Sequence, residues 1–144
     1  MEPLGRHLVF TAKAVRRRFE ERLAEAGGSL PVWAILSGLE LGPCRSQHQL
    51  AGELHIEGPT LTRQLDRLEA EGLIRRTRDA LDRRAIHVET TDAGRELYER
   101  LLTVAITTDA EVRAGLSERE VETLGKLLTK VRSALESAPA ATHT

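Results

Sequence analysis

The densest charge in this sequence of 144 residues is a run of arginines over residues 75–84. These positions hold five arginines against two aspartates, a local net charge of +3. Guanidinium groups bind phosphate through paired hydrogen bonds, so the cluster predicts contact with a polyanion. The whole chain has 21 lysines and arginines against 22 aspartates and glutamates, and its formal net charge is −1. Any contact with nucleic acid must therefore come from local clustering rather than from the overall charge.

Polar residues suited to reading DNA bases lie just upstream of the arginine run. They occupy the side of a leucine-rich segment that faces away from its apolar stripe. Arginine can bind guanine with two hydrogen bonds, and glutamine can bind adenine in the same way. The alternative is that Arg63 and Arg67 only pair with neighbouring carboxylates on a solvated helix face. The candidates for DNA contact in this segment are Thr60, Thr62, Arg63, Gln64 and Arg67.

Two short predicted helices would position these polar residues. Residues 46–49, Ser-Gln-His-Gln, have the form of a capping box that begins one helix, with Leu50 and Leu54 on its apolar face. Pro59 can open the next helix, and Gly72 is placed to end it in a left-handed conformation. The few residues between the two helices include a glycine, which is typical of a helix-turn-helix. The second helix of that motif enters the major groove of DNA.

A β-hairpin is predicted directly after the second helix. Apolar and polar residues alternate over residues 86–89, the period of a strand with one buried face. We expect residues 85–90 to pair with residues 73–77 and to leave residues 78–84 as the hairpin tip. A basic tip beside the helix is suited to reach the DNA backbone or the adjacent minor groove.

The aspartates in the tip are expected to position some of its arginines. A carboxylate beside two arginines can hold one of them through a bidentate pair. We therefore expect Asp82 to hold Arg84 in place, which leaves Arg83 to reach outward.

Residues 1–26 and 91–138 are predicted to form long helices that join two chains. The first helix carries an apolar residue every three or four positions, and the last carries a heptad-like apolar seam. Closed twofold interfaces are the commonest kind, so we expect a homodimer in which these helices interlock. Packing of the seam within one chain is the alternative. The chain is then a single domain over residues 1–144, with a DNA-binding lobe over residues 30–90.

Other classes of function are disfavoured by the composition. Cys44 is the single cysteine, which excludes an internal disulfide, and we expect no redox switch there. The histidines show no zinc-ligand spacing, and the sequence has no phosphate-binding glycine loop, nucleophile elbow or obvious acid-base pair. No apolar run approaches the roughly 20 residues of a membrane span. We expect a soluble cytoplasmic protein that is not an enzyme and has no metal or cofactor.

The order of the elements resembles the winged helix-turn-helix of the MarR/SlyA transcription regulators, closest to the SlyA branch. The resemblance is carried by LAGELHIEGPTLTRQLDRLEAEGLIRRTRDALDRRAIHVETTDAG, residues 50–94. Within it, TLTRQLDRLEAEGLI matches the recognition helix of the family. The wing is matched by Asp82 and Arg84, followed by Thr90-Thr91 and the helix opening TTDAG. The resemblance is close over the central half of the chain and looser at both ends.

This resemblance implies a mainly α fold, a winged helix-turn-helix with a two-stranded β wing and dimerisation helices at both ends. It implies a homodimer that binds a near-palindromic operator in double-stranded DNA as a repressor or an activator, with Arg83 and Arg84 in or near the minor groove. It also implies a small aromatic or phenolic effector in a crevice near Trp33, for which a plain core role is the alternative. The predicted DNA-binding residues are Ser46, Thr60, Thr62, Arg63, Gln64, Arg67, Arg76, Arg78, Asp82, Arg83 and Arg84.

The competing class of function is a winged-helix module that binds another protein and does not read DNA. Because winged helices are reused for several purposes, the fold alone does not distinguish the two classes. A bare arginine-rich tip beside polar recognition positions favours DNA, since a protein-docking surface has no need of it.

Overall fold

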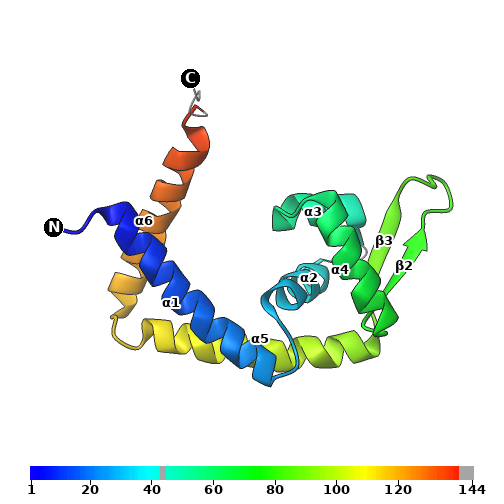
Figure 1. The fold of residues 1–144 in the computed structure, drawn as a ribbon, viewed down its shortest axis with the longest axis horizontal. Coiled ribbons are helices and arrows are strands. Elements are labelled where there is room, and N and C mark those ends of the chain that lie inside the picture. The colour runs from blue at the N-terminus through cyan, green and yellow to red at the C-terminus, as the bar shows by residue number, and fades with distance from the viewer. Residues whose placement is uncertain (43–44, 140–144) are drawn as a thin grey trace. The chain divides into compact units, whose positions relative to one another are not determined.

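The computed structural model describes residues 1–42 and 45–139, which form six helices and three strands. The prediction about Cys44 falls outside the described residues. The chain divides into two compact units, Met1–Thr108 and Asp109–Thr144. In chain order (Figure 1) the elements are α1 Leu4–Glu25, α2 Leu30–Glu40, β1 Arg45–Ser46, α3 Gln47–Leu54, α4 Gly58–Ala70, β2 Ile74–Arg78, β3 Ile86–Thr90, α5 Asp92–Arg113 and α6 Glu118–Ser137.

The predicted helix ends are confirmed where the sequence places a capping residue. Ser46 Oγ accepts a hydrogen bond from the Gln49 backbone N–H at 3.1 Å, and the Gln49 side chain accepts one from the Ser46 N–H at 3.2 Å. Ser29 caps α2 through Val32 N. Gly72 ends α4 with a φ of +75°, a left-handed conformation that glycine adopts without a steric penalty. These ends set the lengths of the helices that make up the helix-turn-helix.

The predicted hairpin is confirmed, and a third short strand extends it. β2 and β3 are antiparallel, with Ile74 opposite Thr90 and Arg78 opposite Ile86. β1 pairs with the other side of β3, so the order of the sheet is β1-β3-β2. The sequence analysis missed β1, because two residues are too few to show a strand period. This added strand ties the start of α3 to the middle of β3.

A single leucine-rich core holds the first unit together. It joins the end of α1, the helices α2 to α4, the base of the wing and the first half of α5. Leu61, Leu65 and Leu68 are almost fully buried and lie on one face of α4, as their spacing predicts. The buried core residues are Leu23, Ile35, Leu36, Leu39, Leu50, Leu61, Leu65, Leu68, Ile74, Val88, Leu97 and Leu101.

The start of α5 is fastened to the junction between α4 and β2. The Thr91 hydroxyl donates to the Gly72 carbonyl at 2.6 Å and accepts from Gly94 N–H at 3.1 Å, which confirms that Thr91 caps this helix. A Cβ atom on Gly94 would lie 2.0 Å from the Leu73 carbonyl oxygen, so no larger residue fits there without movement. The base of the wing is therefore a rigid junction.

The second unit contains α6, which buries none of its described residues. Its start is capped as predicted, because Ser117 Oγ accepts from Glu120 N and the Glu120 side chain accepts from Ser117 N. The heptad-like seam is open to solvent, with Leu124 42%, Leu128 40% and Leu135 72% exposed. Over the described part of the chain, none of the helices is long and apolar enough to span a membrane.

Candidate nucleic-acid interface

The exposed part of α4 carries Arg63 and Arg67. Arg63 lies on the side of the helix that faces away from the buried leucines, and Arg67 lies toward the flank beside α2; both residues are exposed. Arg67 Nε is 3.3 Å from Glu71 Oε1, an exposed pair within one helix that holds its guanidinium only weakly. Among the residues that the structure describes, Arg63 has no hydrogen bond or ion pair from its side chain. Arg63 is therefore the basic group of α4 that is most available to a partner.

Thr62 and Ser46 have structural roles within the helix-turn-helix. Thr62 Oγ1 accepts from the Gln47 amide nitrogen at 2.8 Å and donates to the Gly58 carbonyl at 3.0 Å, so it links α3 to the first turn of α4. Ser46 Oγ is the acceptor of the α3 capping box. The predicted contacts from these two residues would have to share hydroxyls that already hold the motif together.

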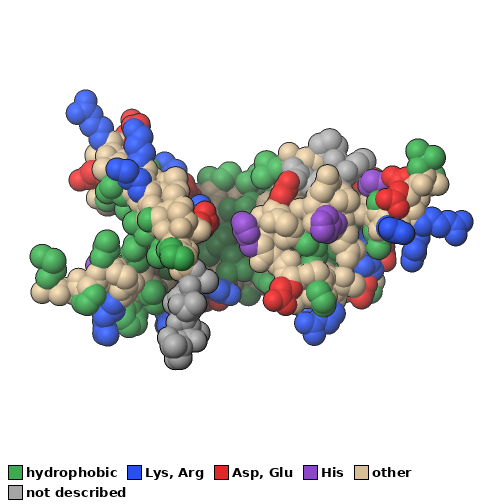
Figure 2. All heavy atoms as spheres, turned by 90° about the horizontal axis from the view of Figure 1, so that it is seen from above, with side chains coloured by type: hydrophobic (Ala, Val, Ile, Leu, Met, Phe, Trp, Pro, Cys, Tyr) green, Lys and Arg blue, Asp and Glu red, His purple; other side chains and the backbone are tan. Residues whose placement is uncertain are grey.

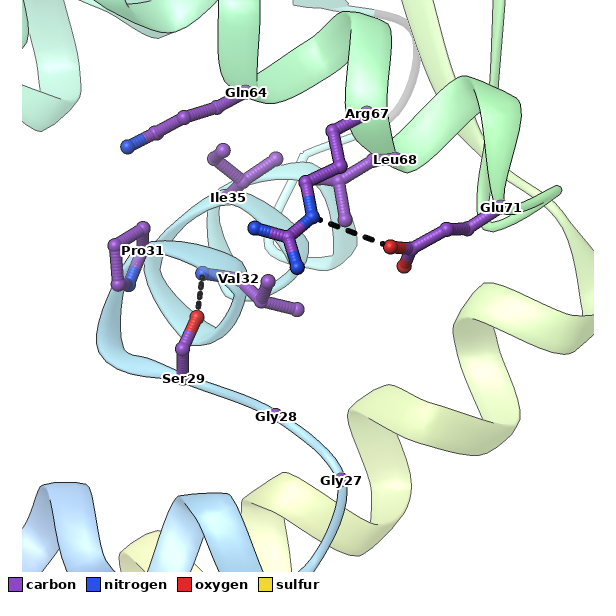
Figure 3. Close-up of a pocket in the computed structure, with 10 residues that line it drawn as sticks. All are labelled: Gly27, Gly28, Ser29, Pro31, Val32, Ile35, Gln64, Arg67, Leu68 and Glu71. Carbon is purple, nitrogen blue, oxygen red and sulfur yellow. Dashed lines mark hydrogen bonds and ion pairs between the residues drawn. The ribbon is translucent and has the colours of Figure 1, made fainter.

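Gln64 and Arg67 line a cavity between α4 and the start of α2 (Figure 3). The cavity has a volume of about 310 Å³, and the loop at Gly27 and Gly28 forms another of its walls. Gln64 Oε1 is buried and has no hydrogen-bond partner within the described residues. The amide of Gln64 thus lies on the α2 flank of the recognition helix, whereas the sequence analysis expected it on the outer face. Thr60, on the first turn of α4, is half-buried.

The wing tip is organised by Asp79, a residue that the sequence analysis did not select. Asp79 Oδ1 accepts from the backbone N–H groups of Leu81 and Asp82, at 2.8 and 3.2 Å. Its other oxygen, Oδ2, lies 2.8 Å from His87 Nε2 on β3. The His87 contact, followed by the two backbone hydrogen bonds, lowers the pKa of Asp79 from 3.8 to about 2. One carboxylate therefore holds both the turn and the adjoining strand.

Asp82 braces the backbone of the tip and not the side chain that we expected. Its Oδ1 accepts from the backbone N–H of Arg84 at 3.0 Å. The Arg83 carbonyl accepts from Arg78 Nη1 at 3.4 Å. The guanidinium groups of Arg83 and Arg84 are exposed, and within residues 1–42 and 45–139 they have no partner. Figure 2 shows arginine side chains projecting from the wing at the right of the view.

Arg76 differs from the other arginines of the wing because its side chain is only 17% exposed. Its Nη2 forms ion pairs with Asp66 and, at 3.1 Å, with Glu69 Oε1. Its Nε and its backbone N–H also donate to Glu69, at 3.3 and 2.8 Å. Arg76, one of the arginines predicted to contact DNA, therefore has its side chain bound to two carboxylates of α4.

Trp33 lies in a cluster of three half-buried aromatic side chains from α1, α2 and α5. It stacks on Tyr98 with ring centroids 5.7 Å apart and planes 6° apart. It also meets Phe19 edge-on, at 6.2 Å and 79°. Such pairs stabilise the junction of the three helices and leave flat aromatic surface near solvent.

The geometry defines the class of fold. A helix-turn-helix, α3 and α4, is followed by an antiparallel wing, so the chain is a winged helix-turn-helix. The model of the MarR family matches residues 29–86, the segment that contains these elements. The MarR-family assignment made from the sequence is therefore confirmed. Proteins of this family are DNA-binding regulators and not enzymes, which agrees with the expectation that this chain is no enzyme.

Solved structures of transcriptional regulators resemble this chain over 90% of its length. A cysteine-to-serine mutant of MarR from E. coli in complex with operator DNA is 28% identical, with a TM-score of 0.82, and the match covers 90% of this chain and 93% of that one. The transcriptional repressor CouR bound to a 23-mer DNA duplex is 27% identical, with a TM-score of 0.84 and coverage of 90% and 92%. A probable transcriptional regulator from Pseudomonas aeruginosa is 28% identical, with a TM-score of 0.80 and coverage of 90% and 97%.

Proposed function

We propose that this chain is a sequence-specific transcriptional regulator, of the SlyA-like branch, that acts in the cytoplasm as a homodimer on a near-palindromic operator. The observation that carries the proposal is the set of exposed, unpaired arginines on two neighbouring elements, Arg63 on α4 and Arg83 and Arg84 on the wing. In this arrangement α4 reads bases in the major groove and the wing tip lies in or near the flanking minor groove. CouR, which is similar along most of its length, is a transcriptional repressor, and we propose repression for this chain as well.

The other predicted residues contribute in two ways. Arg67 and Arg78 add positive charge beside the phosphates, and Thr60 and Ser46 supply hydroxyls at the starts of α4 and α3. Thr62, Gln64 and Asp82 act mainly by shaping the helix-turn-helix and the tip, because their polar atoms already face the protein.

The homodimer is supported by apolar stripes that one chain leaves open. On α1, Val15 is 38% exposed, and on α6 the seam residues Leu124 and Leu128 are 42% and 40% exposed. Exposed apolar surface arranged in a regular stripe is typical of an interface between subunits. We propose that residues 1–26 and 91–138 form that interface, which sets the spacing of two recognition helices at about one turn of DNA.

A small aromatic or phenolic effector is the second part of the proposal. The support is the half-buried cluster of Phe19, Trp33 and Tyr98, which offers ring faces where α1, α2 and α5 meet. An aromatic acid that stacks there would bias the helices that carry the DNA-binding lobe. A core role for Trp33 alone predicts no such response.

Selection of duplexes from a random library, followed by fluorescence anisotropy in a salt titration, tests the proposed function. We expect enrichment of a near-palindromic sequence and an affinity that falls steeply with salt. Absence of binding to any duplex at low salt would contradict the proposal and favour the protein-interaction module.

A further inference from the structure

Arg76 joins β2 to α4 beyond the turn that connects the two elements. Its side chain bonds to Asp66 and Glu69 on α4, ten and seven residues earlier in the chain. Several other ion pairs join residues four apart at the exposed surface, and such pairs contribute little stability. Arg76 uses its guanidinium and its backbone N–H together, so the contact fixes the course of the strand as well as the side chain.

The position of Arg76 on the strand explains why it faces α4. Side chains two residues apart on a strand point to the same face. Ile74 is 2% exposed and is packed in the core, so Arg76 continues the face that is turned toward the helix. Arg75, on the opposite face, pairs across the wing with Glu89 at 3.6 Å and is 65% exposed. The two neighbouring arginines therefore have different surroundings.

We propose that Arg76 is a positioning residue, which holds the wing at a fixed angle to the recognition helix by bridging Asp66 and Glu69, and that it does not contact DNA. This inference rests on the proposed function, since its purpose is to place the tip and α4 on one duplex. The base of the wing is fastened at Gly72 and Leu73, through the bonds to Thr91. β1 holds β3 on one side of the sheet, and Arg76 adds an attachment of β2 to α4 on the other side.

A small change in the angle of β2 at Arg76 would move the wing tip by a larger distance, because the tip extends beyond this contact. An extended chain rises about 3.3 Å per residue, so the residues from Arg76 to Leu81 span at most about 16 Å, and a tilt of about 10° would move the tip by up to about 3 Å. A shift of that size separates a guanidinium group from the phosphate or base that it bonds, because hydrogen bonds need about 2.7–3.2 Å.

The bridge places one guanidinium group against two carboxylates. The side-chain and backbone hydrogen bonds from Arg76 lower the pKa of Glu69. Burial acts to lower the pKa of Arg76, but the hydrogen bonds to Asp66 and Glu69 outweigh it and raise that pKa. Both directions favour the charged forms of Glu69 and Arg76. Arg76 also offsets part of the negative charge that Asp66 and Glu69 place beside α4, which would otherwise repel the phosphates more strongly.

The variant Glu69→Gln distinguishes a direct DNA contact by Arg76 from a positioning role, because the two predict opposite changes in the affinity for the operator. If Arg76 contacted DNA, loss of the Glu69 charge would free it and would strengthen binding. A positioning role predicts about tenfold weaker binding to the selected operator, with lost protection of the minor-groove flanks in hydroxyl-radical footprinting. Binding to random duplex of the same length should stay equal or rise, because the protein has lost a negative charge. Glu89→Gln is the matched control, since it removes the same charge from the opposite face of the wing, and its operator affinity should stay within about twofold of the parent.

A second pair of variants keeps the test decisive if Glu69→Gln is poorly folded. Arg76→Lys keeps the charge but cannot reach both carboxylates, and Arg76→Gln removes the charge. Both should weaken operator binding and lose flank protection to a similar extent, because a retained charge at position 76 does not restore the bridge to both carboxylates. Operator affinity and flank protection kept at the parent level in Arg76→Lys and lost only in Arg76→Gln would show that the charge itself contacts phosphate, and would overturn the inference. The inference would also be overturned if Glu69→Gln bound the operator as well as Glu89→Gln does, or better. It would be overturned too if Glu69→Gln lost affinity for operator and random duplex equally and unfolded at a lower temperature, since that result indicates a general loss of folding. If the parent protein itself does not bind its selected operator more tightly than random duplex, the proposed function fails. That result concerns the parent alone, so it is distinguishable from the outcomes for the variants.

Discussion

His87 Nε2 lies 2.8 Å from Asp79 Oδ2, so a side-chain bond ties β3 to the turn that carries the arginines of the wing. The same carboxylate accepts two backbone hydrogen bonds within the tip. The order of the tip therefore depends on the ionised form of one aspartate.

The first prediction concerns the pH dependence that Asp79 gives to stability. Its pKa is lowered from 3.8 to about 2, so the unfolded chain binds this proton more readily than the folded protein does. Its contribution should be fully present above about pH 4 and should be lost as the pH falls through 2. Denaturant unfolding from pH 6 to pH 2 should show a higher free energy of unfolding for the parent than for Asp79→Asn, and this difference should shrink toward pH 2. Asp82→Asn is the control for a general change of charge in the tip. A difference between the parent and Asp79→Asn that does not change with pH would contradict the role given to the Asp79 carboxylate.

Gly94 should be among the least replaceable residues of the first unit. A methyl group there would lie 2.0 Å from the Leu73 carbonyl oxygen and 2.7 Å from Thr90 Cγ2. Gly94→Ala should lower the free energy of unfolding by about 3 kcal/mol, because the overlap involves backbone and cannot be relieved by a side-chain rotation. Gly52→Ala is the matched control, since open space surrounds Gly52 within α3. It should raise the free energy of unfolding by about 0.5–1 kcal/mol, and equal effects of the two changes would refute the close approach.

The open seam of α6 should be the site at which the dimer can be broken. Leu128→Glu places a charge in the middle of the seam, and we expect monomers in light scattering coupled to size-exclusion chromatography. Thr123→Glu adds the same charge on the opposite side of the helix and should leave the mass of the dimer unchanged. A monomeric parent protein, or a Leu128→Glu protein that stays dimeric, would count against the interface.

An aromatic effector should be detectable through Trp33, the single tryptophan of the sequence. We expect 4-hydroxybenzoate to change the tryptophan fluorescence in a saturable manner and to weaken operator binding by a factor of about 5–150. Cyclohexanecarboxylate has a carboxylate but no aromatic ring, and it should do neither. A fluorescence change that never saturates, with no change in operator affinity, would leave Trp33 as a core residue only.

Local signals account for the parts of this structure that the sequence predicts. The capping serines Ser46 and Ser117 and the left-handed Gly72 act over three or four residues, so each is visible in a short window. The leucines of α4 also predict their own burial, because a helix repeats every 3.6 residues. The helices, the hairpin and the winged arrangement follow from such signals.

The details that the sequence analysis missed depend on residues distant in the chain. The bonds from Arg76 to Asp66 and Glu69 and from His87 to Asp79 form only once the strands have paired. In the sequence, Arg76 and Arg83 look alike, because both lie in the same run of arginines. Their charge alone does not predict that Arg76 pairs with carboxylates of α4 and that the Arg83 side chain is exposed. Gln64 lies on the flank of α4 for a related reason, since the position of α2 decides which polar side chains are covered.

Operator discrimination by the variants Arg63→Ala and Arg83→Ala tests the central claim most directly. Affinities for the selected operator and for random duplex, each measured over a range of salt concentrations, separate base reading from phosphate contact. We predict that Arg63→Ala loses about 1–3 kcal/mol of preference for the operator, whereas Arg83→Ala weakens binding to both duplexes and reduces the salt slope by about one unit. If both variants bind operator and random DNA as the parent does, α4 and the wing do not form the DNA-binding surface.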